Sequence, residues 1–151
     1  MNTGGRMRVH DILKSKGSGF EAISPGQGVK EAINKMLDKK IGSLLVMNNE
    51  ELVGIVTDRD IFWKVNREGD RMLSVKVADI MTTKLVVGLP DDDIETAMAY
   101  MTNNRFRHLP IMDGSKVVGI ISIGDIVKAQ VHNLKVENRY LIDYITGKYP
   151  A

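Results

Sequence analysis

The chain has 151 residues, of which 43% are apolar and 26% are charged, and its formal net charge is +2. This length allows one compact domain or two halves that share a core. With this near balance of charge, nothing marks a disordered tail or a strongly basic nucleic-acid binder, so the bulk charge favours no polymeric partner. The absence of cysteine excludes disulfides and thiolate metal ligands.

No apolar run approaches the roughly 20 residues of a membrane-spanning helix. The first eight residues contain no apolar core of the kind that a signal peptide requires. We therefore expect a soluble, cytoplasmic protein without a membrane partner.

The first half of the chain alternates helical and β-rich segments after a flexible head at residues 1–8. Apolar residues that recur every three and four positions predict a helix, and two β-rich runs around a polar turn predict a hairpin. In chain order, the predictions are a helical turn at Val9–Leu13, a strand at Phe20–Ile23, a helix at Val29–Leu37, strands at Ser43–Met47 and Leu52–Val56, and a helix at Asp58–Val65.

The same order of elements returns in the second half. Ala32 and Asp60 have counterparts in Ala97 and Asp125, 65 positions later, whereas upstream residues are offset by 68 because the first copy has three extra residues in the loop after its first turn. The predictions are a turn at Val77–Met81, strands at Leu85–Leu89, His108–Met112 and Val117–Ile121, a helix through Ile94 and Met101, and a last helix from Ile123 to Gly147.

A duplicated unit of this size cannot bury its own sheet, so we expect two copies to pack face to face with pseudo-two-fold symmetry. The predicted fold class is mixed α+β, followed by a long C-terminal helix. The predicted boundaries are residues 1–8 for the head, 9–70 and 71–130 for the two repeats, and 131–151 for the C-terminal helix and tail.

Each repeat contains an apolar run that opens with glycine and ends on a hydroxyl, with an aspartate three residues later, at Gly54–Asp60 and Gly119–Asp125. This pattern predicts a strand that leads into a helix start, where free N–H groups can hold a phosphate. For a single copy, simple helix capping is the more economical interpretation. The duplication and the basic residues nearby favour ligand binding, which uses the same amides.

The two motifs and the strand entry Arg105–Ile111 resemble those of a tandem pair of CBS (cystathionine-β-synthase-type) domains, a Bateman module, over about Met7 to Lys128. The chain is similar to small stand-alone bacterial members. The resemblance implies an adenosine ligand between the repeats, with AMP or NAD(H) favoured over ATP and S-adenosylmethionine.

The resemblance also implies roles for individual residues. Asp60 and Asp125 would take ribose hydroxyls, and Thr57 and Ser122 would help to hold a phosphate. Backbone groups of each repeat's first strand would read adenine, and basic residues would reach the phosphate. The ligand-binding residues predicted in this way are Glu21, Ala22, Ile23, Thr57, Arg59, Asp60, Val86, Val87, Gly88, Arg107, His108, Pro110, Ser122 and Asp125.

The two predicted sites are not equivalent. Arg107 and His108 should face Thr57 and Asp60, but the first repeat has Gly42 and Ser43 at the corresponding positions. The site of Ser122 and Asp125 therefore relies on Lys39 or Lys40, takes a less charged ligand, or stays empty.

The last helix carries a four-three repeat, which is typical of a coiled-coil seam. Either it folds back over its own repeats or it pairs with a second chain, and family resemblance favours a homodimer. The repeat is formed by Val127, Val131, Leu134, Asn138, Leu141 and Ile145.

These patterns predict a non-enzymatic sensor that changes shape or association when it binds a nucleotide and passes this change to an unknown downstream protein. The alternative is a nucleic-acid binder, suggested by the pI of 8.8 but opposed by an aromatic content of 5%. The sequence shows no plausible pair of a catalytic nucleophile and a general base, so an enzyme is the least favoured interpretation. His10 and His132 have no spaced partners that would form a metal site.

Overall fold

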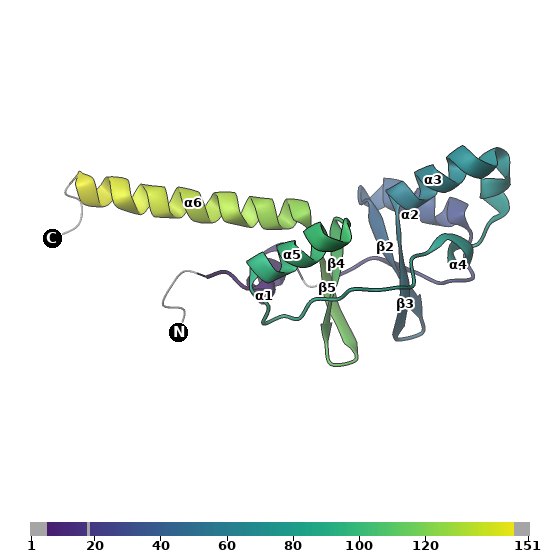
Figure 1. Ribbon diagram of the computed structural model, residues 1–151, viewed down its shortest axis with the longest axis horizontal. Coiled ribbons are helices and arrows are strands. Elements are labelled where there is room, and N and C mark those ends of the chain that lie inside the picture. Colours follow the sequence, from purple (N-terminus) through teal and green to yellow (C-terminus); the bar gives the residue numbers. More distant parts are fainter. Residues whose placement is uncertain (1–5, 18, 147–151) are drawn as a thin grey trace.

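The computed structural model describes residues 6–17 and 19–146. It consists of two mixed α/β halves that lie side by side and one long helix that extends away from them (Figure 1). This is the α+β architecture with a C-terminal helix that the sequence predicts.

The first half contains a three-stranded sheet in which β1 runs parallel to β2, and β2 and β3 form the predicted antiparallel hairpin. The helices at Val29–Lys39 and Asp58–Glu68 lie on one side of this sheet (Figure 1). In chain order, the elements from the N-terminus are α1 (Val9–Lys16), β1 (Ala22–Ile23), α2 (Val29–Lys39), β2 (Ser43–Asn48), β3 (Glu51–Thr57), α3 (Asp58–Glu68) and the 3-10 helix η1 (Gly69–Ser74).

The second half repeats this arrangement with a two-stranded antiparallel sheet. Its last helix is described as far as Ile145, so the predicted end at Gly147 lies outside the described residues. The elements are α4 (Val77–Ile80), α5 (Ile94–Asn104), β4 (His108–Asp113), β5 (Lys116–Ser122) and α6 (Ile123–Ile145).

The predicted strand at Leu85–Leu89 is wrong, because this segment contributes only an isolated parallel bridge from Gly88 to Ile111. The difference follows from one residue. In the first half, the N–H of Leu45 donates to the carbonyl of Glu21 at 3.1 Å. The corresponding position in β4 is Pro110, which has no N–H to donate, so a regular ladder cannot form.

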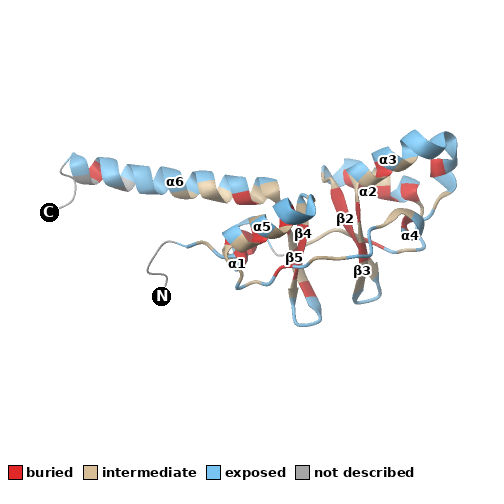
Figure 2. Cartoon of the chain, in the orientation of Figure 1, coloured by how far each residue is buried: buried red, intermediate tan, exposed pale blue. Residues whose placement is uncertain are grey.

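Two separate hydrophobic cores lie in the two halves, and each is completed by a helix from outside its own sheet region. Val9, Ile12 and Leu13 of α1 are buried in the core of the second half, with Leu109 and Ile121. Correspondingly, the first core contains Met72 of η1 and Val77 of α4. Figure 2 shows the buried residues gathered in the strands and the helix faces beside them.

Backbone hydrogen bonds fix this crossed arrangement. The N–H of Val9 donates to the carbonyl of Asp92 at 2.9 Å, which joins the start of α1 to the start of α5. The N–H of Val77 donates to the carbonyl of Gln27 at 2.8 Å, which joins α4 to α2 in the same way. Each sheet therefore packs against a helix that precedes the other repeat.

The glycine that opens each motif allows this helix to approach closely. A Cβ atom at Gly119 would lie 2.6 Å from Cδ2 of Leu13, and one at Gly54 would lie 2.7 Å from Sδ of Met81. Leu13 and Met81 are counterparts at the upstream offset of 68. These two contacts show that the pseudo-two-fold relation extends from the sheets to the crossing helices.

Helix α6 contacts α1, α5 and β5, and its residues as far as Glu137 line a cavity with Met7 and Ile94. Its C-terminal part projects from the body and does not fold back over the repeats (Figures 1 and 2). The residues of its four-three repeat are exposed to solvent. None of the described helices is long and apolar enough to cross a membrane.

Candidate functional site

Cavity A lies between the two halves, has a volume of about 500 Å³, and contains the motif of one repeat and the basic residues of the other. The hydroxyl and carboxylate come from the β3–α3 junction, as does Arg59, whereas Arg105 and Arg107 come from the α5–β4 connection. Its lining is formed by Ile55, Thr57, Arg59, Asp60, Thr82, Lys84, Leu85, Val86, Asn104, Arg105, Phe106, Arg107, His108 and Pro110.

Thr57 and Asp60 form a capping box at the start of α3. The N–H of Thr57 donates to Oδ2 of Asp60 at 2.9 Å, and the N–H of Asp60 donates to Oγ1 of Thr57 at 3.2 Å. The capping interpretation is therefore correct, and the same two side chains also line cavity A. The hydrogen bond from the Thr57 N–H uses Oδ2 of Asp60, so the other carboxylate oxygen, Oδ1, takes no part in that bond.

Arg107 and His108 reach the cavity from the other half. Nη2 of Arg107 lies 3.7 Å from Oδ1 of Asp58, which forms a half-exposed ion pair between the two halves. Burial and then the charge of Arg107 lower the pKa of His108, and the opposing influence of Asp58 is smaller. His108 is therefore neutral at pH 7, and Arg107 carries the positive charge of this pair.

The wall opposite the motif offers a backbone acceptor. Val86 lines cavity A, and its carbonyl corresponds in sequence to that of Glu21 in the first half. Glu21 accepts the N–H of Leu45 at 3.1 Å, but Pro110 has no N–H, and no described backbone N–H donates to Val86. Pro110 thus leaves the carbonyl of Val86, a residue that lines cavity A, without a backbone donor, so this carbonyl is a candidate hydrogen-bond acceptor for a ligand.

Cavity B is the pseudo-symmetric counterpart and has a volume of about 510 Å³. Ser122 and Asp125 form the same reciprocal contact, at 2.8 Å from the Ser122 N–H and 3.0 Å from the Asp125 N–H. The remaining lining residues are Lys16, Gly19, Phe20, Glu21, Lys40, Ile41, Gly42, Ser43, His108, Ile120 and Ile121.

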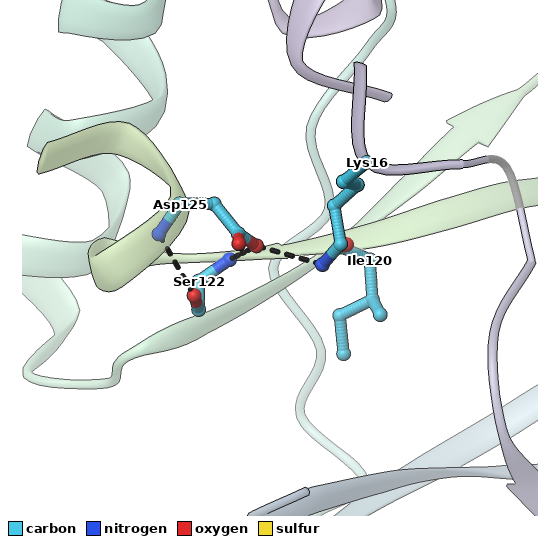
Figure 3. A network of polar contacts seen from close by, with 4 residues as sticks. All are labelled: Lys16, Ile120, Ser122 and Asp125. Atoms are coloured by element: carbon cyan, nitrogen blue, oxygen red, sulfur yellow. Dashed lines mark hydrogen bonds and ion pairs between the residues drawn. The ribbon is translucent and has the colours of Figure 1, made fainter. Parts of the chain in front are cut away.

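Lys16 distinguishes cavity B from cavity A (Figure 3). Its Nζ lies 2.7 Å from Oδ2 of Asp125 and donates to the carbonyl of Ile120 at 3.0 Å. The counterpart of that carbonyl, in Ile55, instead accepts the backbone N–H of Thr82 at 2.8 Å. The ammonium of Lys16 thus takes the place of a backbone N–H and also pairs with the motif aspartate.

Helix length explains why the two halves differ here. Helix α1 has eight residues and ends at Lys16, whereas α4 has four and ends before the corresponding chain segment. The counterpart of Lys16 is Lys84, which lines cavity A but makes no ion pair with any described residue. The repeat with the three extra residues is therefore also the one whose lysine, Lys16, pairs with the aspartate of the other repeat, Asp125.

The predicted site residues divide into three groups. Cavity A collects Thr57, Arg59, Asp60, Val86, Arg107, His108 and Pro110. Cavity B collects Glu21, Ser122 and Asp125, with His108 shared between the two cavities. Neither cavity is lined by Ala22, Ile23, Val87 or Gly88, of which Ile23 belongs to the core and Gly88 bridges to β4.

Of the two lysines proposed for cavity B, Lys40 lines it, and Nζ of Lys39 lies 3.8 Å from Oε1 of Glu21. Sequence reasoning missed Lys16 and Lys84. The offset of 68 that aligns Asp11 with Asp79 also aligns these two lysines, and this alignment could have indicated that they occupy equivalent positions in the two halves. The described residues contain no group of three or more carboxylates and histidines that could hold a metal ion.

The CBS-domain family model matches residues 9–66 and 77–132, which together make up most of the chain. The chain belongs to the CBS-domain family. Among curated relatives, CBS domain-containing protein CBSX3, mitochondrial, from Arabidopsis thaliana is 36% identical over 150 residues, which cover 93% of this chain and 73% of the relative. This likeness includes both CBS repeats.

Solved structures share the CBS-pair fold. The CBS-domain protein ATU1752 from Agrobacterium tumefaciens has a TM-score of 0.82 and 33% identity, and covers 86% of this chain and 98% of its own. CBSX2, whose structure was solved in complex with AMP, has a TM-score of 0.69 and 27% identity, and covers 83% of this chain and 96% of its own. The prediction of a tandem CBS pair is confirmed.

The contact between Lys16 and Asp125 in the CBS pair predicts a pH effect. Burial raises the pKa of Asp125, but hydrogen bonds from Lys16 and Ser122 outweigh burial and lower it. The carboxylate therefore contributes stability above its unfolded-state pKa, near 3.8, and this is lost as the pH falls through the lower folded-state value. In Lys16→Met, we expect the Asp125 pKa to rise, as measured by carboxyl NMR titration.

Lys14→Met is the matched control, because Lys14 is exposed on the same helix and lies outside both cavities. It should leave the titration of Asp125 unchanged. An Asp125 pKa that is the same in Lys16→Met and in the unaltered chain would show that the ammonium does not pair with this carboxylate in solution.

Proposed function

We propose that this CBS pair is a non-enzymatic sensor that binds AMP or NAD(H) in cavity A. The observation that carries the proposal is the meeting of three kinds of group in one cavity: the capped carboxylate of Asp60, the cation of Arg107 and the unpaired carbonyl of Val86. The AMP complex of the structural neighbour CBSX2 supports an adenosine ligand.

Each part of AMP has a complementary group in cavity A. Oδ1 of Asp60 accepts a ribose hydroxyl while Oδ2 keeps the helix cap. The phosphate lies at the N-terminus of α3, near the hydroxyl of Thr57 and the guanidinium of Arg107, where the helix dipole and free N–H groups favour an anion. The amino group of adenine donates to the carbonyl of Val86.

A phosphate in this position joins the two halves. Arg107 now pairs with Asp58 across the halves at 3.7 Å, and a phosphate offers it a more strongly charged partner. A ligand shifts a conformational equilibrium only by its difference in affinity for the two states. We propose that the state in which Arg107 lies over the N-terminus of α3 is the one that the ligand favours.

Cavity B differs in ligand or affinity, because its aspartate is already paired with Lys16 and its first-strand carbonyl is already bonded to Leu45. We therefore propose that the first equivalent of nucleotide occupies cavity A. Cavity B binds ribose only if Lys16 leaves Asp125.

We also propose that the protein acts in the cytoplasm as a homodimer that signals to a downstream protein. Large apolar side chains on α2 and α3 are exposed, including Leu37 at 70%, Phe62 at 73% and Trp63 at 61%. Phe62 and Trp63 line one cavity, and large exposed apolar side chains of this kind support a protein interface. Phe62 and Trp63 share this cavity with Arg59 and Arg107. Two neighbouring aromatics do not make a stacking series, and the aromatic content of 5% disfavours nucleic acid as the ligand.

Calorimetric titration with AMP, ATP, NADH and S-adenosylmethionine tests the proposed ligand class. We expect one molecule of AMP or NADH per chain at the tightest site. Inosine monophosphate is the matched control, because it carries an oxygen on C6 in place of the amino group of adenine. This oxygen would face the carbonyl of Val86 and should weaken binding at least about tenfold. Absence of binding by all four ligands at millimolar concentration would contradict the proposal.

A further inference from the structure

Helix α6 carries a stripe of apolar residues that the body leaves uncovered. Ile126 is fully buried, but the stripe residues are 45% to 80% exposed. With about 100° between successive residues, Ile126, Gln130 and Asn133 lie on the face toward the body, and the stripe is centred about 100° away from it. The stripe consists of Val127, Val131, Leu134, Leu141 and Ile145.

Leu134 also lines a cavity of about 430 Å³ with Met7 and Ile94, so a second helix along the stripe would lie beside the body at this level. The stripe also continues past the last contacts with α1 and α5, where α6 projects alone (Figure 1). A projecting helix with one apolar side is stable in water only when that side is covered.

The residue types along the stripe specify the partner. In heptad terms, the a positions hold Val131, Asn138 and Ile145, and the d positions hold leucine at 134 and 141 and valine at 127. β-branched residues at a with leucine at d favour two parallel strands, and a single asparagine at a fixes their register. We propose that α6 pairs with α6 of a second copy as a parallel, in-register, two-stranded coiled coil.

Asn138 decides the orientation of the two helices. In a parallel pair, a positions face each other, so the amide of Asn138 can bond to the partner's Asn138. In an antiparallel pair, a positions face d positions, and the amide would be buried against leucine without a bond. That arrangement carries the cost of an unsatisfied buried polar group.

Charges beside the seam favour the same orientation. If all six a and d positions, from 127 to 145, pack against a partner in an antiparallel pair, the two helices cross near residue 136. This register would place Lys135 near the partner's Lys135 and Glu137 near the partner's Glu137. Like charges that face each other destabilise a pair. In the parallel register, Lys135 faces the partner's Gln130 and Glu137 faces the partner's Ile142, so no like charges meet.

The absence of cysteine in the chain allows a direct test. Leu141→Cys places a thiol at a d position, where two parallel chains bring like residues within disulfide reach. Val136→Cys is the matched control, because Val136 is 53% exposed on α6 but lies at an outward position. Under mild oxidation, we expect Leu141→Cys to form covalent dimers at least about tenfold faster than Val136→Cys.

Equal rates for the two variants would overturn the proposal, and so would a monomeric unaltered chain in light scattering, which would assign the stripe to a different protein. Asn138→Leu provides a second readout that keeps the helix intact. In a coiled coil, this change removes the polar pair and should tighten association at least about tenfold while loosening the parallel register. On an unpaired helix, it leaves the association unchanged. Nucleotide titration of the same samples keeps this result separate from ligand binding in cavity A.

Discussion

An Asp60→Ala variant is expected to bind AMP roughly 10 to 150 times more weakly than the unaltered chain. A hydrogen bond to a charged group is worth about 1.5–3 kcal/mol, and 1.4 kcal/mol corresponds to a factor of ten in affinity. The carboxylate is partly buried in cavity A and already oriented by the N–H of Thr57 at 2.9 Å, so the ligand need not order it. Calorimetry with AMP measures the loss.

Asp11→Ala is a closely matched control. Oδ2 of Asp11 accepts the N–H of Arg8 at 2.9 Å in the capping box of α1, and Asp11 lines neither cavity. Both variants lose a helix cap, but only one loses a ribose acceptor. Equal losses of AMP affinity in the two variants would show that Asp60 acts only as a cap.

A Leu13→Ala variant should destabilise the second half of the protein, although Leu13 lies in the segment that leads into the first half. Leu13 is 6% exposed and lies in the core with Leu109 and Ile121, so its truncation should cost about 2–5 kcal/mol. We expect amide hydrogen exchange to accelerate mainly in β4 and β5, and less in β2 and β3. Leu73→Ala, at a position that is 57% exposed, should change little.

Faster exchange confined to β2 and β3 after Leu13→Ala would contradict the crossed cores. If both halves lost protection equally, the protein would instead unfold as a single cooperative unit, and α1 would stabilise both cores to the same extent.

The repeat made most of the fold predictable. A constant offset of 65 between the halves aligned the hairpins and helix starts, and period-three and period-four spacing located α2 and α5. The contacts that depend on residues far apart in sequence were not predictable in this way. Nothing in the pattern around Leu13 indicates that it packs against Gly119, because local periodicity reports which face is buried but not which partner covers it.

The candidate site was predictable to a similar extent. Thr57, Asp60, Arg107 and His108 meet in one cavity as expected. The strand predicted at Leu85–Leu89 does not form, because β-propensity reports on one segment and not on its neighbour. Pro110, in the neighbouring strand, has no N–H to donate to it. Lys16 was missed because its role depends on where α1 ends, and helix ends are the least certain part of a sequence interpretation.

The crossed helices also bear on how such a protein could have arisen. A single repeat would lack the helix that completes its core, because in this chain that helix comes from the segment before the other repeat. One unit alone could bury its sheet only by exchanging helices with a second molecule, so it would be stable only at concentrations that favour pairing. Joining two units in one chain makes the exchange intramolecular and removes that dependence on concentration. A chain cut between the repeats should therefore regain its fold only when both pieces are present together.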